Sequence, residues 1–194
     1  MIVKICGITS LGDAGIAIEA GASALGFNFF PKSPRAIRPE AARAIVERLP
    51  AGVLKVGIFV NEAPAWVVEA VTRAGLDVAQ VIGETPADVR TWKVHRVGKD
   101  FSAGQLDDPF AEAFLLDTPA PGLYGGTGHT FDWARARIEG KRIVIAGGLG
   151  PDNVAAAIRE SRPWGVDACS RLESSPGRKD PEKVKAFVAA ALGG

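Results

Sequence analysis

The sequence predicts a closed parallel barrel of eight strand–helix units, the (β/α)8 or TIM-barrel fold. Along its 194 residues, short apolar or β-branched runs alternate with amphipathic helical patterns from one end to the other. Most of the runs are apolar at nearly every position, as in parallel strands that are covered on both faces. No linker, low-complexity tract or change of composition interrupts the pattern, so we expect residues 1–194 to form a single domain.

Eight runs are expected to be the strands of this barrel. They are Ile2–Cys6, Ala24–Phe29, Leu54–Val60, Val78–Ile82, Val94–Val97, Ala113–Asp117, Arg142–Gly147 and Val166–Ser170. Between them, apolar residues recur at helical spacing, as in the sets Ala42, Ile45, Val46, Leu49 and Val184, Phe187, Val188, Ala191. Helix starts are indicated by Pro39, Pro151 and Pro181, and by Asp180 as an N-cap.

The pattern is weakest in the middle of the chain. Residues 85–91 and 98–112 leave room only for short or irregular helices after the fourth and fifth strands. The chain is also at the lower end of the barrel range, which begins at roughly 200 residues. An open, doubly wound sheet is the alternative, but no GxGxxG motif follows the first strand to favour it.

Composition excludes several classes of protein. The 23 basic and 22 acidic residues give a net charge of +1, which offers no electrostatic reason to expect nucleic acid or an anionic membrane as a partner. No apolar run approaches the roughly 20 residues that span a bilayer. Two cysteines are too few for a disulfide framework, so we expect reduced thiols in the cytoplasm. The two histidines, His95 and His129, form no Cys/His cluster with metal-ligand spacing, which argues against a metal mechanism.

In a barrel, function gathers where the strands end. Cys6 ends the first strand before a glycine, and Lys4 shares its face, one layer deeper inside. A buried lysine needs a partner, and closure of the barrel offers Asp167 on the last strand. The alternative for Cys6 is a small buried hydrophobe; for Cys169, packing is the expected role.

Asp117 ends the apolar run AFLLD. Burying an unpaired carboxylate is costly, so a role as general acid or base with a raised pKa competes with that of a loop-capping aspartate. Two glycine-containing loops follow the seventh and eighth strands, where barrels often bind phosphate through backbone N–H groups. Arg35, after the second strand, is a candidate for binding a carboxylate, although its spacing alone favours a solvated loop arginine.

Six stretches, spread over nearly the whole chain, read KICGIT, ALGFNFFPKSPRAI, KVGIFVNE, LLDT followed by GGTGHTFDW, AGGLGPDNV and ESSPGRKDPEKV. In this order they resemble the phosphoribosylanthranilate isomerase family of tryptophan biosynthesis; the first and fourth are the most specific. The resemblance implies a (β/α)8 barrel that converts N-(5-phosphoribosyl)anthranilate into the 1-deoxyribulose 5-phosphate by an Amadori rearrangement, with no cofactor.

By the matching motifs, Cys6 resembles the family's general base and Asp117 its general acid. Arg35 matches the anchor of the anthranilate carboxylate. Gly147, Gly148, Ser170 and Arg171 match the positions that hold phosphate, largely through backbone groups. The expected partner is therefore a small phosphorylated substrate, bound by a monomer or a homodimer.

The chain departs from the family pattern at three places. Ile82 stands where the QLHG segment has histidine, the SSG of the last loop is replaced by Cys169, Ser170 and Arg171, and the middle of the chain is shorter. Two rival functions follow. One is another phosphosugar barrel, such as the isomerase of histidine biosynthesis, which has an aspartate at the position of Cys6, or a dual-substrate relative. The other is a silent barrel that binds a sugar phosphate without turnover.

Overall fold

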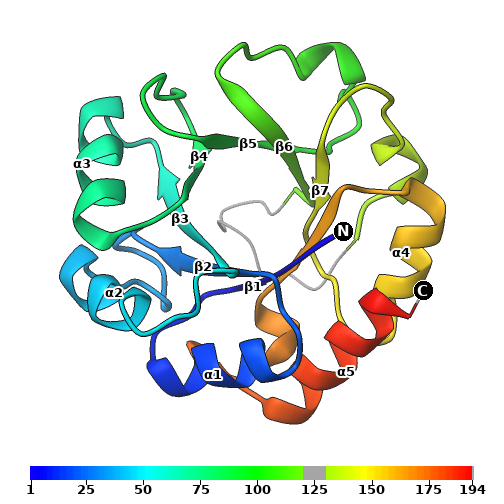
Figure 1. Cartoon of the computed structure of the whole chain (residues 1–194). Coiled ribbons are helices and arrows are strands. Elements are labelled where there is room, and N and C mark those ends of the chain that lie inside the picture. The colour runs from blue at the N-terminus through cyan, green and yellow to red at the C-terminus, as the bar shows by residue number, and fades with distance from the viewer. Residues whose placement is uncertain (120–129, 194) are drawn as a thin grey trace.

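The computed structural model describes residues 1–119 and 130–193. Eight parallel strands pair in sequence order and close into a barrel, because β8 also pairs with β1. Figure 1 looks into this ring, with the helices around its outside. The strands are β1 (Ile2–Cys6), β2 (Ala24–Asn28), β3 (Leu54–Val60), β4 (Val78–Ile82), β5 (Thr91–Arg96), β6 (Ala111–Asp117), β7 (Ile143–Ile145) and β8 (Gly165–Ala168). The predicted barrel is confirmed.

Five α-helices cover part of the barrel: α1 (Leu11–Glu19), α2 (Pro39–Val46), α3 (Pro64–Ala74), α4 (Val154–Ser161) and α5 (Pro181–Leu192). Within the described residues, β4 leads to β5 without a helix, and β5 is followed only by the 3₁₀ turn Ala103–Gln105. The expected reduction of these two helices to short or irregular elements is confirmed after β5, and after β4 the reduction is complete, since no helix forms there. Further 3₁₀ turns are Trp133–Ala136 and Ser170–Leu172, and β9 (Glu173–Ser175) pairs with β10 (Arg178–Lys179) outside the barrel.

Two of the three predicted helix starts are correct. Pro39 and Pro181 are the first residues of α2 and α5, where proline loses no hydrogen bond. Asp180 caps α5 by accepting from the backbone N–H groups of its first turn. The expectation at Pro151 is wrong: α4 begins at Val154, because Pro151 lies in the turn that precedes it.

Strand limits differ from the prediction at β5 and β8. β5 begins at Thr91, three residues before the expected Val94, and a buried Trp92 lies within it. β8 ends at Ala168 rather than Ser170, because Cys169 (φ −136°, ψ −86°) leaves the extended conformation and precedes a 3₁₀ turn. Ser170 therefore lies in a turn at the mouth of the barrel.

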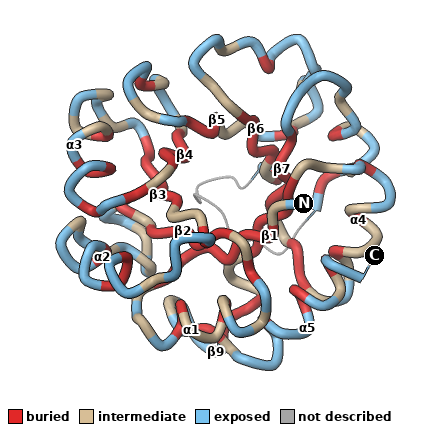
Figure 2. The backbone as a smooth tube through the Cα atoms, in the orientation of Figure 1, coloured by how far each residue is buried: buried red, intermediate tan, exposed pale blue. Residues whose placement is uncertain are grey.

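Buried residues form two layers, and Figure 2 shows them concentrated on the ring of strands. The larger layer packs between the barrel and its helices. The smaller fills the barrel interior, where the bulky Trp92 packs beside the small residues Ala24 and Ala113. Trp164, just before β8, meets Trp92 edge-on with ring centroids 5.5 Å apart. Because the amino-terminal part of the interior is filled, the pocket opens at the other end, where the strands finish.

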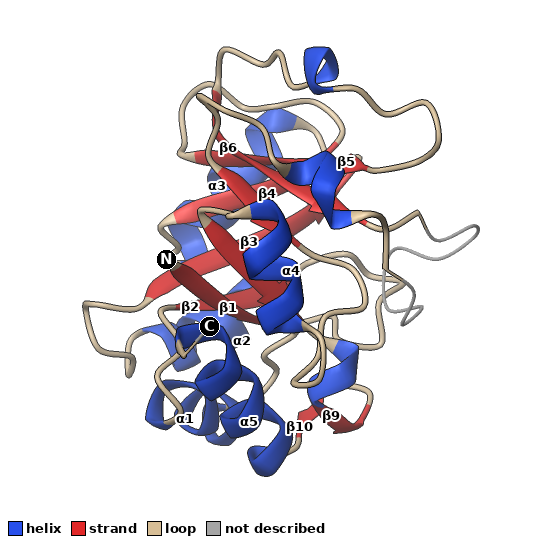
Figure 3. Cartoon of the chain, turned by 90° about the vertical axis from the view of Figure 1, so that its right-hand side faces the viewer, coloured by secondary structure: helices blue, strands red, loops and turns tan. Residues whose placement is uncertain are grey.

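The side view in Figure 3 shows the helices on the flanks of the sheet, with β9 and β10 beside α5. Among the helices of the described residues, none has the length and apolar character that crossing a membrane requires.

Candidate active site

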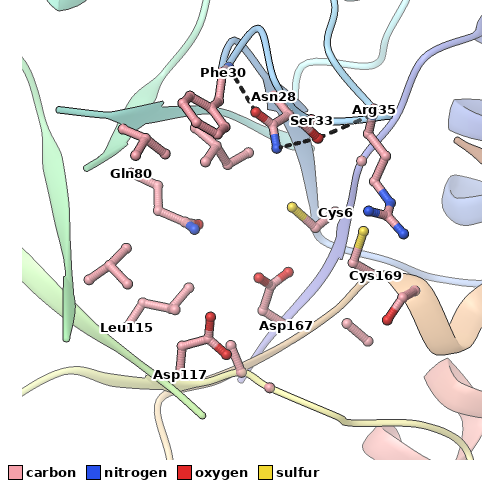
Figure 4. A pocket seen from close by; sticks show the side chains of 18 of the residues that line it. Cys6, Asn28, Phe30, Ser33, Arg35, Gln80, Leu115, Asp117, Asp167 and Cys169 are labelled. Atoms are coloured by element: carbon pink, nitrogen blue, oxygen red, sulfur yellow. Dashed lines mark hydrogen bonds between the residues drawn. The ribbon is translucent and has the colours of Figure 1, made fainter. Parts of the chain in front are cut away.

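A cavity of about 440 Å³ opens at the carboxyl ends of the barrel strands. Six of the seven predicted site residues line it: Cys6, Arg35, Asp117, Gly147, Gly148 and Ser170. Arg171 is the exception and does not line it. Figure 4 shows the side chains of Cys6 and Asp117 pointing into this space from β1 and β6. Both come from the ends of their strands, where the sequence places them.

The thiol of Cys6 occupies space beside Gly26, which has no side chain. Cys6 pairs with Gly26 on β2, and a Cβ atom at Gly26 would lie 2.8 Å from its Sγ atom. The next residue, Gly7, has φ +78°, and a Cβ there would meet Arg35 and Cys169 at 2.7 and 2.9 Å. Glycine at both positions thus allows the thiol, Arg35 and Cys169 to pack around the start of one loop.

The predicted partner of Lys4 is confirmed. Lys4 and Asp167 are paired across the seam between β1 and β8, and Lys4 Nζ donates to Asp167 Oδ1 at 2.9 Å. Lys4 is fully buried. Burial alone would lower the pKa of Lys4, but the negative charges of Asp167 and Cys6 together outweigh burial, and the pKa lies above the ordinary value. For Asp167 burial prevails over the attraction of Lys4 and raises its pKa to about 7.

The surroundings of Cys6 favour its thiolate. A hydrogen bond from the Cys169 thiol is the largest cause, and the charges of Lys4 and Lys179 add to it. Together they outweigh burial and hold the pKa of Cys6 well below its ordinary range. The same hydrogen bond, with burial, raises the pKa of Cys169 well above its ordinary range. Cys169, which was expected to pack, also lines the cavity beside Cys6.

The surroundings of Asp117 favour its protonated form, in contrast to those of Cys6. Burial raises its pKa to about 6, and the negative charge of Cys6 acts in the same direction. The Thr118 backbone N–H and Arg96 partly oppose this rise. Space for the carboxyl group depends on Gly147, where a Cβ atom would lie 2.6 Å from Asp117 Oδ1. The cavity therefore combines a group that loses its proton easily with one that retains it.

The loop after β7 carries two consecutive residues with positive φ, Gly147 (+85°) and Gly148 (+68°). The carbonyl of Gly148 accepts hydrogen bonds from Asn153 Nδ2 at 3.0 Å and from Arg171 Nη1 at 3.1 Å. Arg171 also pairs with Asp152 at 2.8 Å, so its guanidinium is turned toward this loop and α4. Its side chain supports the glycine loop from outside the cavity.

Arg35 is not a solvated loop arginine. Its Nε and Nη2 atoms donate to both carboxylate oxygens of Glu173, at 2.8 and 2.7 Å. The buried Lys179 holds the same carboxylate at 3.0 Å. The loop before Arg35 is fixed by Ser33, whose Oγ accepts from the backbone N–H of Arg35 and from Asn28 Nδ2 (Figure 4). Glu173 and Lys179 are residues that the sequence argument missed, because nothing local signals a pair 138 residues apart in the chain.

The wall formed by β3 to β6 is mainly apolar, made of Ile58, Val60, Ile82, Val94 and Leu115. Besides Asp117 at the end of β6, Gln80 is the polar residue of this wall, and it extends into the cavity (Figure 4). Its Oε1 atom is buried and has no hydrogen-bond partner among the residues described. The residues at 1–119 and 130–193 include no group of three His, Cys, Asp or Glu side chains arranged as a metal would need.

Comparison with known proteins identifies the family. The model of the N-(5'-phosphoribosyl)anthranilate (PRA) isomerase family matches residues 3–190. The chain belongs to this family. The PRA isomerase of Solibacter usitatus is 52% identical over 98% of this chain and 97% of its own.

Solved PRA isomerase structures share the fold. That of the Thermus thermophilus enzyme is 38% identical, with a TM-score of 0.89 over 100% of this chain and 99% of its own. A PRA isomerase in complex with reduced 1-(o-carboxyphenylamino)-1-deoxyribulose 5-phosphate is 36% identical, with a TM-score of 0.81 over the whole of both chains.

Two departures from the PRA isomerase pattern have a clear place in the structure. Ile82 ends β4 as part of the apolar wall, and Arg171 contacts the glycine loop. Part of the GGTGHTFDW motif, residues 125–129, lies outside the residues that the structure describes.

Proposed function

We propose that this cavity carries out the rearrangement that defines the family, from N-(5-phosphoribosyl)anthranilate to 1-(2-carboxyphenylamino)-1-deoxyribulose 5-phosphate, with Asp117 as acid and Cys6 as base. The single observation behind the assignment is the electrostatic contrast between the two groups. Cys6 has a pKa well below its ordinary range, and Asp117 has a pKa raised to about 6, in one cavity. An enzyme that must donate one proton and remove another needs this combination.

The chemistry follows from these proton states. Asp117 donates its proton to the furanose ring oxygen, which opens the ring to an iminium ion. The thiolate of Cys6 then takes the proton from the sugar C2, and the electron pair moves into the iminium to give an enolamine. The enolamine tautomerises to the ketone. Because the iminium of the substrate accepts the electrons, side chains suffice and no cofactor is expected.

Phosphate binding is proposed at the loops after β7 and β8. In a trans peptide the C=O and the following N–H point in opposite directions. Since Asn153 and Arg171 hold the Gly148 carbonyl outward, we expect the next N–H, that of Leu149, to face the cavity that Leu149 lines. The turn that begins at Ser170 offers further backbone N–H groups. Here Arg171 positions the loop, while backbone groups contact the phosphate.

Arg35 is the proposed anchor for the anthranilate carboxylate. Glu173 uses only the Nε and Nη2 atoms of the guanidinium, so Nη1 still has donors for a second carboxylate. Glu173 and Lys179 then hold the arginine in one orientation. The apolar wall contacts the aromatic ring in this arrangement, and Gln80 Oε1 accepts a hydrogen bond from a sugar hydroxyl.

One assay tests the proposal. The protein is mixed with freshly made phosphoribosylanthranilate, and the loss of substrate fluorescence is followed for the parent chain, Cys6→Ala and Asp117→Asn. Turnover by the parent that both substitutions abolish supports the two roles. Binding without turnover in the parent contradicts them and leaves the silent barrel, which Ile82 and Arg171 keep open. Light scattering during gel filtration decides between the expected monomer and homodimer.

A further inference from the structure

The two cysteines of the chain lie side by side at the seam where the barrel closes. The pairing of β1 with β8 ends with Ile5 opposite Ala168, so Cys6 and Cys169 are the next residues along the two chain segments. Adjacent strands lie about 4.8 Å apart, and a disulfide requires Cα atoms at about 4.4–6.8 Å. Both thiols line the same cavity, and Figure 4 shows them as neighbours. A Cβ atom at Gly7, the residue after Cys6, would lie 2.9 Å from the Cys169 Sγ atom, so the second thiol lies against the turn that follows the first.

The two sulfur atoms differ in the way that a disulfide-forming pair requires. Lys4 and Lys179 contribute positive charge beside Cys6, whereas the Cys169 thiol donates to Glu173 Oε1 at 3.8 Å. Cys6 is therefore the thiolate, which is the form that attacks an oxidant. Cys169 keeps its proton and is positioned to react second, since it lines the same cavity as Cys6.

We propose that Cys6 and Cys169 form an oxidation site, at which a peroxide converts the pair into a reversible disulfide that switches the barrel off. The inference that the disulfide stops turnover rests on the proposed role of Cys6 as the base. The formation of the disulfide itself does not depend on that role.

The steps balance with hydrogen peroxide as the oxidant. The Cys6 thiolate attacks one peroxide oxygen, the O–O bond breaks, and the products are Cys6 sulfenic acid and hydroxide. The Cys169 sulfur then attacks the sulfenic sulfur, and the S–O bond breaks while the S–S bond forms. The departing oxygen leaves as water with the thiol proton. Each sulfur loses one electron, and peroxide gains both.

The disulfide would also protect the chain from irreversible damage. A sulfenic acid that finds no thiol is oxidised further to the sulfinic acid, which ordinary thiol reductants do not reverse. Because the chain has only two cysteines, Cys169 is the one intramolecular partner that can intercept Cys6. Oxidation is thus diverted into a bond that dithiothreitol can reduce.

The test follows mass and turnover together. The folded protein is treated with increasing hydrogen peroxide, quenched with an alkylating agent, and examined by intact mass, peptide mapping and fluorescence assay. We expect the parent chain to lose the mass of two hydrogen atoms, with the cross-link mapped to Cys6 and Cys169. Turnover should fall in proportion to the cross-linked fraction and return with dithiothreitol.

Two matched variants complete the design. Cys169→Ser should instead gain oxygen atoms on Cys6, and dithiothreitol should not remove them. Cys6→Ser should keep Cys169 as an unmodified thiol at the same peroxide dose. Sulfinic acid on Cys6 of the parent chain, or disulfide-linked dimers on a non-reducing gel, would overturn the proposal. A complete cross-link with undiminished turnover would instead refute Cys6 as the base, so the two failures are distinguishable.

Discussion

Replacing Gly147 by alanine should damage catalysis far more than its effect on stability suggests. A Cβ atom there would lie 2.5 Å from the backbone nitrogen of Thr118 and 2.6 Å from Asp117 Oδ1. Ordinary contact begins at 3.4 Å, so the carboxyl group must retreat by about 0.8 Å, the difference between 3.4 and 2.6 Å. A misplacement of about 1 Å in a reacting group costs roughly 100-fold in rate.

Gly140→Ala is the matched control for this substitution. Gly140 has φ +73°, close to the +85° of Gly147, but a Cβ atom at Gly140 meets nothing within 4 Å. Both variants therefore suffer the strain of a side chain at positive φ, about 1–2 kcal/mol. Only Gly147→Ala also collides with its neighbours, including Asp117.

Urea unfolding and the fluorescence assay together measure both effects. Gly140→Ala should lose about 1–2 kcal/mol in the free energy of unfolding while keeping its kcat/KM. Gly147→Ala should lose more stability than the control, and its kcat should fall roughly 100-fold. Equal kcat values for the two variants would show that the loop yields without moving Asp117. A rise confined to KM would assign the damage to phosphate binding instead.

Three further predictions concern charge. Since Asp117 must carry a proton and its pKa is raised to about 6, kcat/KM should fall about tenfold per pH unit above that value; a profile that stays flat up to pH 8 would contradict its role as acid. Lys4→Met leaves Asp167 buried without its cation and should lower the free energy of unfolding by about 3–5 kcal/mol. The pKa of Asp167 is already above its unfolded value of about 3.9 and would rise further without Lys4. The folded variant would then keep Asp167 protonated at a pH where the unfolded chain has lost that proton. The loss in the free energy of unfolding should therefore be greater at pH 8 than at pH 5. Urea titrations at the two pH values check this sign, and a larger loss at pH 5 would reverse it. Arg171→Ala removes a donor to the Gly148 carbonyl and should raise KM with little change in kcat. Arg159→Ala, at an exposed position of α4, is the control and should change neither constant. Steady-state kinetics measure both variants, and equal KM values would contradict the prediction.

The strands that carry the site were predictable because their signal is local. The apolar runs ending at Cys6 and Asp117 mark β1 and β6 in the sequence itself. The pairing of Lys4 with Asp167 was also predictable, although 163 residues separate them, because closure of any such barrel places the last strand beside the first. Alternation along a strand then decides which side chains face inward.

Side chains beyond the strand ends were not predictable in this way. Cys169 was expected to pack, but its backbone leaves the extended conformation directly after β8, and alternation no longer determines where it points. Arg171 was expected among the phosphate-holding residues, yet its guanidinium reaches Asp152 and the Gly148 carbonyl. A loop conformation depends on contacts from distant segments, and a single sequence does not carry those contacts in a periodic pattern.

Barrel closure assembles the groups that lower the pKa of the proposed base. The groups that favour the Cys6 thiolate come from both ends of the chain: Lys4 from β1, Cys169 from the turn after β8, and Lys179 from β10. Before β1 and β8 pair, Cys6 has only the nearby lysine, and a cysteine thiol in an unfolded chain has a pKa of about 8.5. The seam that completes the fold is therefore also the step that creates the thiolate, and it brings the one thiol able to bond with it to the same place. Both proposals, Cys6 as the base and the Cys6–Cys169 disulfide, thus depend on the same contact between the first and last strands.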